Sequence, residues 1–284
     1  MIRRGSALLA GLVLLGVAVG VVASFGGVAP ARRPGSPPVA LLHLPRRLPN
    51  RFIELPILLY HRIDRLTAAL PFITRRLTVE PRDFADQMSW VKRHGFHPLT
   101  QRQLFAGLEK GARLPCRPLL ITFDDGYSDV LDNAAPVLRR LGMPATMYVI
   151  TDRPQLVNSG FLSWGGVKEL EREGFDIGSH TVTHRPLTSL SDQEVVEELV
   201  RSRGELERRL GHPVQWLAYP HGAVDERVVE LARGAGYVLA VTTSPATIQD
   251  AGDPLELHRL EILDSTGVAG LAEALSPAAV SCRP

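Results

Sequence analysis

Hydrophobic and polar positions follow two alternating patterns from about residue 54 onward. Short, nearly continuous apolar runs predict buried strands, and stretches with apolar residues three or four positions apart predict amphipathic helices. The predicted strands are 56–61, 118–123, 145–150, 175–180, 214–220, 237–243 and 258–262, and the predicted helices are 80–95, 100–111, 134–142, 165–174, 191–211 and 225–236. This alternation favours an α/β fold with a parallel sheet, either open or closed into a barrel.

Helix boundaries are marked by capping residues. Thr100 with Gln103, and Ser191 with Glu194, have the spacing of a capping box, in which each side chain bonds the backbone N–H of the other residue. Gly111 follows the first of these helices, where a left-handed C-cap is common. We therefore expect helices to begin at 100 and 191.

The N-terminal part differs from the rest of the chain. After Arg3 and Arg4, the run from Ala7 to Phe25 contains no charge. An apolar helix of ~20 residues is long enough to span a bilayer, and the two arginines would keep the N-terminus in the cytoplasm. Residues 1–29 are thus expected to be an uncleaved signal anchor or a signal peptide cleaved near Ala31, which would place the remaining chain outside the cytoplasm.

The remaining chain is expected to consist of two parts. Residues 30–50 are rich in proline and arginine and predict a linker, and residues 51–284 predict one domain with a core at about 54–265. The net charge is +2 and the domain has no basic stripe, which argues against nucleic acid as a partner. The sequence predicts no particular oligomeric state.

The chain has two cysteines, Cys116 and Cys282. This number excludes a disulfide-rich scaffold and a multi-cysteine zinc site. Their spacing alone does not decide whether they pair, and we expect two unpaired thiols.

Polar residues that can carry chemistry follow the predicted strands. His61 comes after the first strand, Asp124 and Asp125 follow the second, His180 ends a later one, and His221 comes after "LAYP". The carboxyl ends of parallel strands meet at one edge of a sheet or one mouth of a barrel. We therefore expect these side chains to lie together.

His180 and His184 are four residues apart, a spacing that puts both imidazoles on one side of a helical turn. With Asp124 or Asp125 they would form a site of three protein ligands and open positions, the pattern of catalytic rather than structural metal sites. The second aspartate could then act as a general base toward a water molecule. The alternatives are a solvated acidic turn and ordinary surface or core histidines.

The segments "TFDDG", "SHTVTH" and "LAYPHG", in this order, resemble the carbohydrate esterase family 4 polysaccharide deacetylases, or NodB-homology domain, over about 54–265. The resemblance implies a deformed (β/α)7 barrel that removes acetyl groups from N-acetylated sugars with a divalent metal ion, usually Zn2+, with Co2+ or Ni2+ as alternatives. It implies Asp124 as catalytic base and Asp125, His180 and His184 as metal ligands. "PILLYHRI" and "YPHG" resemble the branch that acts on poly-β-1,6-N-acetylglucosamine.

The chain also departs from the family pattern. The arginine that orients the base aligns with Ala218, and the usual tyrosine aligns with His221, although its oxyanion role uses a backbone N–H that any residue keeps. His258 in "LELH" would be the general acid, or else an exposed loop residue. Trp164 would line the pocket, or else pack in the core. The residues implied to bind substrate are His61, Trp164, Tyr219, Pro220, His221 and Gly222.

The sequence therefore predicts an extracytoplasmic, membrane-tethered, metal-dependent polysaccharide N-deacetylase. Its partners would be an N-acetylated polysaccharide and, through the N-terminal helix, the membrane. One alternative is an O-acetyl esterase that acts on a glycan with the same residues. Another is a catalytically silent sugar-binding module, which the missing arginine at position 218 keeps open.

Overall fold

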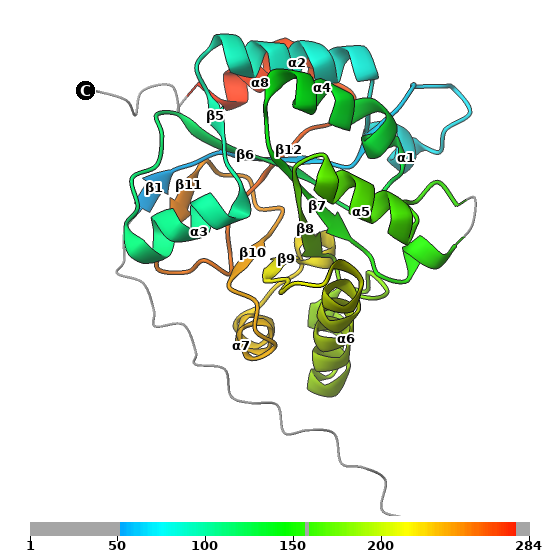
Figure 1. Cartoon of the computed structure of the whole chain (residues 1–284), viewed down its shortest axis with the longest axis vertical. Helices are drawn as coiled ribbons and strands as arrows, with labels where there is room; N and C mark the ends of the chain where they lie inside the picture. Colours follow the sequence, from blue (N-terminus) through cyan, green and yellow to red (C-terminus); the bar gives the residue numbers. More distant parts are fainter. Residues whose placement is uncertain (1–51, 157–158, 277–284) are drawn as a thin grey trace, which may run out of the picture. The chain divides into compact units, whose positions relative to one another are not determined.

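The computed structural model describes residues 52–156 and 159–276. Its central sheet is parallel, with the strand order β10-β9-β8-β7-β6-β2-β12, and β5 adds to β6 beside this path. These strands are β2 (Ile57–Tyr60), β5 (His97–Pro98), β6 (Pro118–Phe123), β7 (Ala145–Val149), β8 (Phe175–Ser179), β9 (Trp216–Ala218), β10 (Leu239–Val241) and β12 (Leu260–Glu261). Figure 1 shows them at the centre of the domain, with helices around them.

The two edges of this sheet are connected by one short segment. Leu257 forms a parallel bridge with Val241 at the end of β10, and three residues later β12 pairs with β2. The backbone N–H of Leu257 donates to Ala240, and its carbonyl accepts from Thr242. The sheet is therefore curled toward a barrel, as predicted for the NodB type of (β/α)7 fold.

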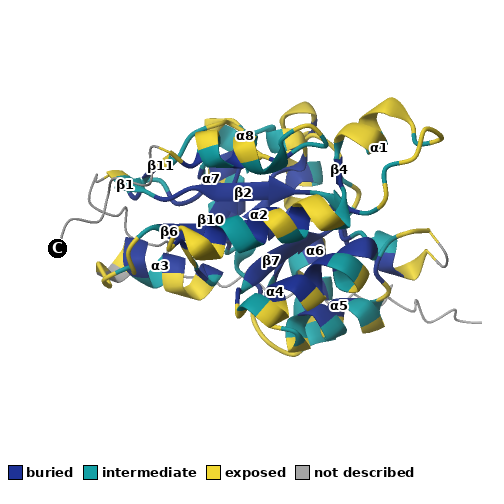
Figure 2. Cartoon of the chain, turned by 90° about the horizontal axis from the view of Figure 1, so that it is seen from above, coloured by how far each residue is buried: buried dark blue, intermediate teal, exposed yellow. Residues whose placement is uncertain are grey.

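Helices surround the curled sheet. They are α1 (Phe72–Arg76), α2 (Pro81–Arg93), α3 (Gln101–Lys110), α4 (Ala135–Leu141), α5 (Trp164–Arg172), α6 (Asp192–Leu210), α7 (Glu226–Gly234) and α8 (Gly267–Ala274). Figure 2 shows the central strands β2, β6, β7 and β10 mainly dark blue and the outward helix surfaces yellow. The helix α8 lies beyond the predicted core boundary near 265, but it packs against α2 and buries Leu271.

The predicted helix starts are confirmed. Thr100 caps α3 and forms both hydrogen bonds of the capping box with Gln103, and Ser191 does the same with Glu194 at α6. Gly111 ends α3 in the left-handed conformation, with φ 64°. Local sequence thus determines where these two helices begin.

Several small elements have no signal in the hydrophobic pattern. The strand β1 (Phe52–Glu54) pairs antiparallel with β11 (Ile248–Asp250), and β3 (Arg62–Ile63) pairs with β4 (Thr78–Val79). The chain also forms a π-helix at Val130–Ala134 just before α4. Two- and three-residue strands depend on a distant partner, so they carry too few residues for a periodic signal.

Both faces of the sheet are buried, and they have different neighbours. On β6, Leu119, Ile121 and Phe123 pack with α2, α4, α5 and α8 in the largest hydrophobic cluster. Leu120 faces the other way, into a cluster with side chains of β2, β7, β9 and β10, which is the inside of the curled sheet. Because side chains alternate along a strand, Thr122 and the following Asp124 also lie on the inner side.

Cys116 is disulfide-bonded, so the expectation of two unpaired thiols is wrong. Cys282, the second cysteine of the chain, lies outside the described residues, as do the predicted anchor at 1–29 and linker at 30–50. Within 52–156 and 159–276, no helix is sufficiently long and apolar to span a membrane.

Candidate active site

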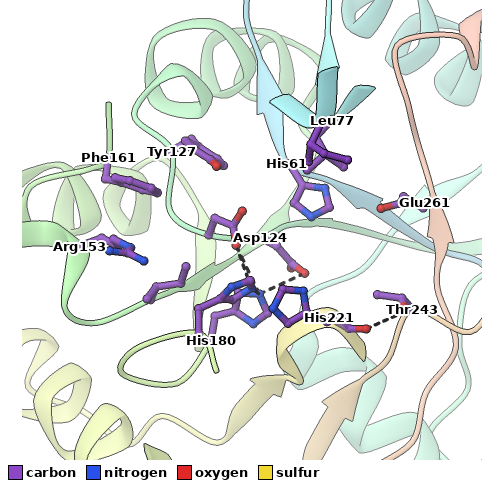
Figure 3. A pocket seen from close by; sticks show the side chains of 14 residues that line it. His61, Leu77, Asp124, Tyr127, Arg153, Phe161, His180, His221, Thr243 and Glu261 are labelled. Carbon is purple, nitrogen blue, oxygen red and sulfur yellow. Dashed lines mark hydrogen bonds and ion pairs between the residues drawn. The ribbon is translucent and has the colours of Figure 1, made fainter. Parts of the chain in front are cut away.

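A pocket of about 520 Å³ opens at the carboxyl ends of β2, β6, β8 and β9. Ligand pockets commonly have volumes of this size. Figure 3 shows its side chains pointing toward a common centre. They are His61, Ile73, Leu77, Asp124, Asp125, Tyr127, Ile150, Arg153, Phe161, His180, His184, His221, Thr243 and Glu261.

Asp124 lies one residue past the end of β6. Its backbone N–H donates to the carbonyl of Tyr60 at 3.0 Å, which continues the pairing of β6 with β2. Because the alternation along β6 is preserved, the carboxylate points into the curled sheet, and only 2% of the residue is exposed.

Arg259 holds this carboxylate through two hydrogen bonds. Its Nη1 donates to Asp124 Oδ1 and its Nη2 to Oδ2, both at 2.7 Å. The same guanidinium donates to the carbonyl of Thr242 at 2.7 Å and to Thr122 Oγ1 at 3.2 Å, and Arg259 is fully buried. Such a bidentate pair fixes both the charge and the orientation of the carboxylate. The orienting arginine that is missing at position 218 is therefore replaced from a different segment.

The surroundings of Asp124 keep it ionised. Burial by itself would raise the pKa of this carboxyl, but the charge of Arg259, followed by that of His180, outweighs burial and lowers the pKa to about 2. Asp124 is consequently a carboxylate at every pH near neutral, available to accept a proton.

Asp125 turns away from Asp124 at once. It has φ 71°, and Gly126 follows with φ 85° and donates its N–H to the carbonyl of Asp124 at 2.9 Å. Glycine adopts such a φ without steric cost, which explains its place after the two aspartates. The tight turn lets two adjacent carboxylates enter different surroundings.

His180 follows directly after β8 and is almost completely buried. Its Nδ1 lies 2.8 Å from the carbonyl oxygen of Ala218, which can only accept a hydrogen bond, so Nδ1 carries the proton. The other nitrogen, Nε2, lies 3.5 Å from Asp125 Oδ1 and 3.1 Å from Nε2 of His184. This is the arrangement by which outer hydrogen bonds orient metal-binding histidines.

His184 reaches the same point from a loop, and the expected helical turn between the two histidines is wrong. Thr181 and His184 have φ 64° and φ 67°, which no right-handed helix contains. The buried Glu198 of α6 shapes the loop, because its carboxylate accepts from the N–H groups of Val182 and Thr183 at 2.8 and 2.9 Å.

Three of these side chains fit a divalent cation. The ligand atoms of Asp125, His180 and His184 all lie within 4.8 Å of one another. Asp125 Oδ1 is buried without a hydrogen-bond partner, and burial together with the nearby His180 lowers the pKa of His184 to about 4. One carboxylate and two imidazoles, which bind a metal ion in their neutral form, are a common set of ligands for catalytic zinc.

Backbone strain is concentrated at this site. Five non-glycine residues in the described part of the chain have positive φ, and four of them are Asp125, Thr181, His184 and His221. Each such residue costs roughly 1–3 kcal/mol, which the rest of the fold must offset. Three of these four residues line the pocket, and Thr181 follows His180 directly, so the strain is concentrated at the site.

The turn at Tyr219–Gly222 has a single amide without a hydrogen-bond partner among the described residues, and it belongs to His221, which lines the pocket. Tyr219 donates to Val241, Gly222 donates to Tyr219, and Pro220 has no N–H. The Tyr219 ring packs in the core, and a Cβ at Gly222 would lie 2.1 Å from Thr243 Oγ1, so the turn allows no larger residue there.

Five of the expected site residues are not among those that line the pocket: Trp164, His258, Tyr219, Pro220 and Gly222. Trp164 begins α5, packs against the main core and has the Arg209 guanidinium 4.8 Å above its ring. The backbone of His258 is held by Gln249 at 2.8 Å, and its side chain is not among those that line the pocket. His61 does line the pocket, with a buried Nδ1 that has no partner among the described residues.

Sequence reasoning did not find Arg259, nor the pocket residues Tyr127, Arg153 and Phe161. A signal for Arg259 existed, since a charged residue between Leu257 and Leu260, at the predicted strand 258–262, indicates a buried charge with a partner. No comparable local signal marks Arg153 or Phe161, because they lie in an irregular connection after β7.

Comparisons with known proteins agree with this geometry. The family model for polysaccharide deacetylase matches residues 111–240. YxkH of Bacillus subtilis (strain 168), whose name assigns it to the polysaccharide deacetylases, is 30% identical over 77% of this chain and 74% of its own length. The poly-beta-1,6-N-acetyl-D-glucosamine N-deacetylase of Staphylococcus epidermidis is 25% identical over 71% of this chain and 76% of its own length.

Solved structures show the same similarity. The Streptococcus pyogenes deacetylase PplD, determined in complex with acetate, superimposes with a TM-score of 0.72 at 28% identity over 78% of this chain and 98% of its own. BC0361, a polysaccharide deacetylase from Bacillus cereus, gives 0.68 at 31% identity over 80% of this chain and 69% of its own. The fold, the sequence motifs and these relatives together show that the chain belongs to the polysaccharide deacetylase family, whose members are hydrolases that release acetyl groups.

Proposed function

We propose that this protein is a metal-dependent N-deacetylase that acts on an N-acetylglucosamine-containing polysaccharide outside the cytoplasm. The observation that carries the proposal is that a possible cation site and a buried, ionised carboxylate lie side by side in one pocket. A possible cation site formed by Asp125, His180 and His184 lies beside a buried carboxylate that Arg259 holds ionised.

The cation site and the base have separate tasks in this proposal. A divalent cation, when bound by Asp125, His180 and His184, would polarise the acetyl carbonyl and lower the pKa of a water molecule. Asp124 accepts the proton of the attacking water, a role that requires an ionised carboxylate close to the reacting carbon. Arg259 keeps that carboxylate aimed at the pocket.

The backbone turn at His221 supplies a hydrogen-bond donor for the oxygen atom that becomes negatively charged during hydrolysis. As water adds to the acetamide carbon, negative charge develops on the carbonyl oxygen, and the unused N–H of His221 can donate to it. The leaving amine then needs a proton. His258 remains the sequence-based candidate for this donor, and His61 is a second candidate because it lines the pocket.

Hydrolysis of an N-acetyl group is supported over the alternatives by two observations. The Staphylococcus epidermidis relative is named for N-deacetylation of poly-β-1,6-N-acetyl-D-glucosamine. A silent sugar-binding module would need the cation site but not a buried Asp124–Arg259 pair, and burying a charge pair is costly. The extracytoplasmic location rests on the sequence of residues 1–29 alone.

Acetate release tests the proposal. The full chain is incubated with β-1,6- and β-1,4-linked N-acetylglucosamine oligomers and with O-acetylated xylan oligomers, with and without a chelator, and then with added Zn2+, Co2+ or Ni2+. We expect release from an N-acetylated oligomer that the chelator abolishes and added metal restores. Release from the O-acetylated oligomers alone would identify an esterase, and no release with any metal would contradict an enzymatic role on these substrates.

A further inference from the structure

A stack of four side chains lies beside the pocket, and three of the four line it. The rings of Tyr127 and Phe161 are stacked, with centroids 4.8 Å apart and an interplanar angle of 19°. The Arg62 guanidinium lies 4.9 Å from the centroid of Tyr127, and that of Arg153 lies 5.4 Å from the centroid of Phe161. Tyr127, Phe161 and Arg153 line the pocket together with the possible cation ligands, as Figure 3 shows.

The rings serve mainly to hold the arginines. Each ring already has the other ring and one guanidinium as stacking neighbours, so little ring surface is left on which a sugar could stack. Tyr127 and Phe161 are also joined by an antiparallel bridge, which fixes the stack at the backbone. Stacking orients a guanidinium in advance and reduces the entropy lost when it binds a ligand.

The two arginines of the stack differ in their partners. Arg62 donates to Asp129 at 2.8 Å and to Asp64 at 3.2 Å, so carboxylates already satisfy it. Arg153 has one carboxylate nearby, Asp152, with Nε and Oδ1 3.5 Å apart and no hydrogen bond between them. No described residue accepts a hydrogen bond from the Arg153 guanidinium, and its Nε is buried.

Arg153 therefore has unused hydrogen-bonding capacity that is directed into the pocket. It is the only lysine or arginine among the described residues that line the pocket. Its Nε is buried, but the side chain is 32% exposed, so the two Nη groups are the donors that a ligand in the pocket can reach. Guanidinium groups favour carboxylate and phosphate because two parallel N–H groups match two oxygens.

We propose that Arg153 forms a subsite for an anionic group of the saccharide, a carboxylate or a phosphate on or beside the N-acetylated sugar. This inference rests on the proposed function, since it names the substrate class of the same pocket. It distinguishes an acidic glycan from a neutral N-acetylglucosamine homopolymer. The Tyr127–Phe161 pair holds Arg153 at one side of the cation site, so the acetyl group and the anion bind at the same time.

The test compares three oligomers of equal length on the full chain: a neutral N-acetylglucosamine oligomer, one with a glucuronic acid neighbour, and one with a phosphate on the neighbouring sugar. We expect kcat/KM to be about tenfold higher for at least one acidic oligomer, because hydrogen bonds between a guanidinium and an anionic group are stronger than those between neutral groups. The acidic oligomer with the higher kcat/KM shows whether the subsite prefers a carboxylate or a phosphate. Arg153→Gln should abolish the preference, and Arg153→Lys should retain part of it.

Arg139→Gln is the matched control, because Arg139 is exposed and pairs with a single carboxylate, Glu173, away from the pocket. It should leave the preference unchanged. Equal kcat/KM on all three oligomers, or a preference that Arg153→Gln does not alter, would overturn the proposal.

Binding of the same oligomers to an Asp124→Asn variant separates this proposal from the proposed function. Tighter binding of an acidic oligomer that depends on Arg153 supports the subsite even if no oligomer releases acetate. Acetate release without any Arg153-dependent preference supports the deacetylase and overturns the subsite.

Discussion

Asp124 and Asp125 are adjacent in the chain, yet their carboxylates have different hydrogen-bond partners in the pocket. Asp124 has both oxygens occupied by Arg259, and its pKa is lowered to about 2. Asp125 has a buried oxygen with no hydrogen-bond partner, directed at two imidazole nitrogens. In the proposed function, one carboxylate is held as a base by protein contacts and the other is left for a cation. Like charges this close would otherwise raise one of the two pKa values.

The largest effect on the free energy of unfolding is expected when Asp124 loses the guanidinium of Arg259. Arg259→Met leaves a buried, uncompensated carboxylate, which typically costs about 3–5 kcal/mol of the free energy of unfolding. Urea denaturation measures this change. The double variant Asp124→Asn, Arg259→Met should recover most of the loss, because it removes both charges. A single variant that loses less than about 1 kcal/mol, the value for a surface pair, would show that Arg259 does not stabilise Asp124.

The next prediction concerns the residue that protonates the leaving amine. His61 lines it with an unpartnered Nδ1, whereas His258 does not line it. We expect His61→Gln to lower kcat by about 10²-fold, the lower end of general acid–base effects. His258→Gln should lower it far less, and acetate release under saturating substrate measures both. The reverse order would return the acid role to His258.

The pH dependence of stability isolates Asp124. Its pKa is about 2 in the folded protein and 3.8 ordinarily, so the unfolded chain binds the proton more readily. Asp124 therefore stabilises the fold above about pH 4, and this contribution is lost as the pH falls toward 2. At about 1.4 kcal/mol per pKa unit, the contribution is about 2–3 kcal/mol. The unfolding free energy of wild type should fall more steeply in this interval than that of Asp124→Asn; parallel curves would contradict the assignment.

The smallest effect concerns the support of Arg259. Thr122 Oγ1 accepts from Arg259 at 3.2 Å and donates to the carbonyl of Leu58 at 2.7 Å. Thr122→Val keeps the shape but removes both hydrogen bonds, which should cost about 1 kcal/mol and change kcat/KM only slightly. Denaturation and acetate release measure the two quantities. A loss of activity as large as that of Arg259→Met would mean that Thr122 itself orients the base.

The surroundings of Asp125 could be predicted from the sequence, whereas those of Asp124 could not. Asp125, His180 and His184 lie in two short motifs, so local spacing identifies them, although the loop geometry between the histidines depends on Glu198 of a distant helix. Capping boxes at Thr100 and Ser191 are similarly local.

The partner of Asp124 is 135 residues away, and it comes from the segment that connects the two sheet edges. Only the curl of the sheet brings Arg259 to the inner face of β6. For the same reason, the stack of Arg62, Tyr127, Phe161 and Arg153 combines three separate segments that no periodic pattern connects.

The most direct test of the division between the two carboxylates is the metal content of Asp124→Asn and Asp125→Asn, measured with acetate release on the same samples. The account predicts that Asp124→Asn binds one Zn2+ per chain, as wild type does, but releases no acetate, and that Asp125→Asn loses both the metal and the activity. An Asp124→Asn variant without metal, or an active and metal-replete Asp125→Asn variant, would contradict it.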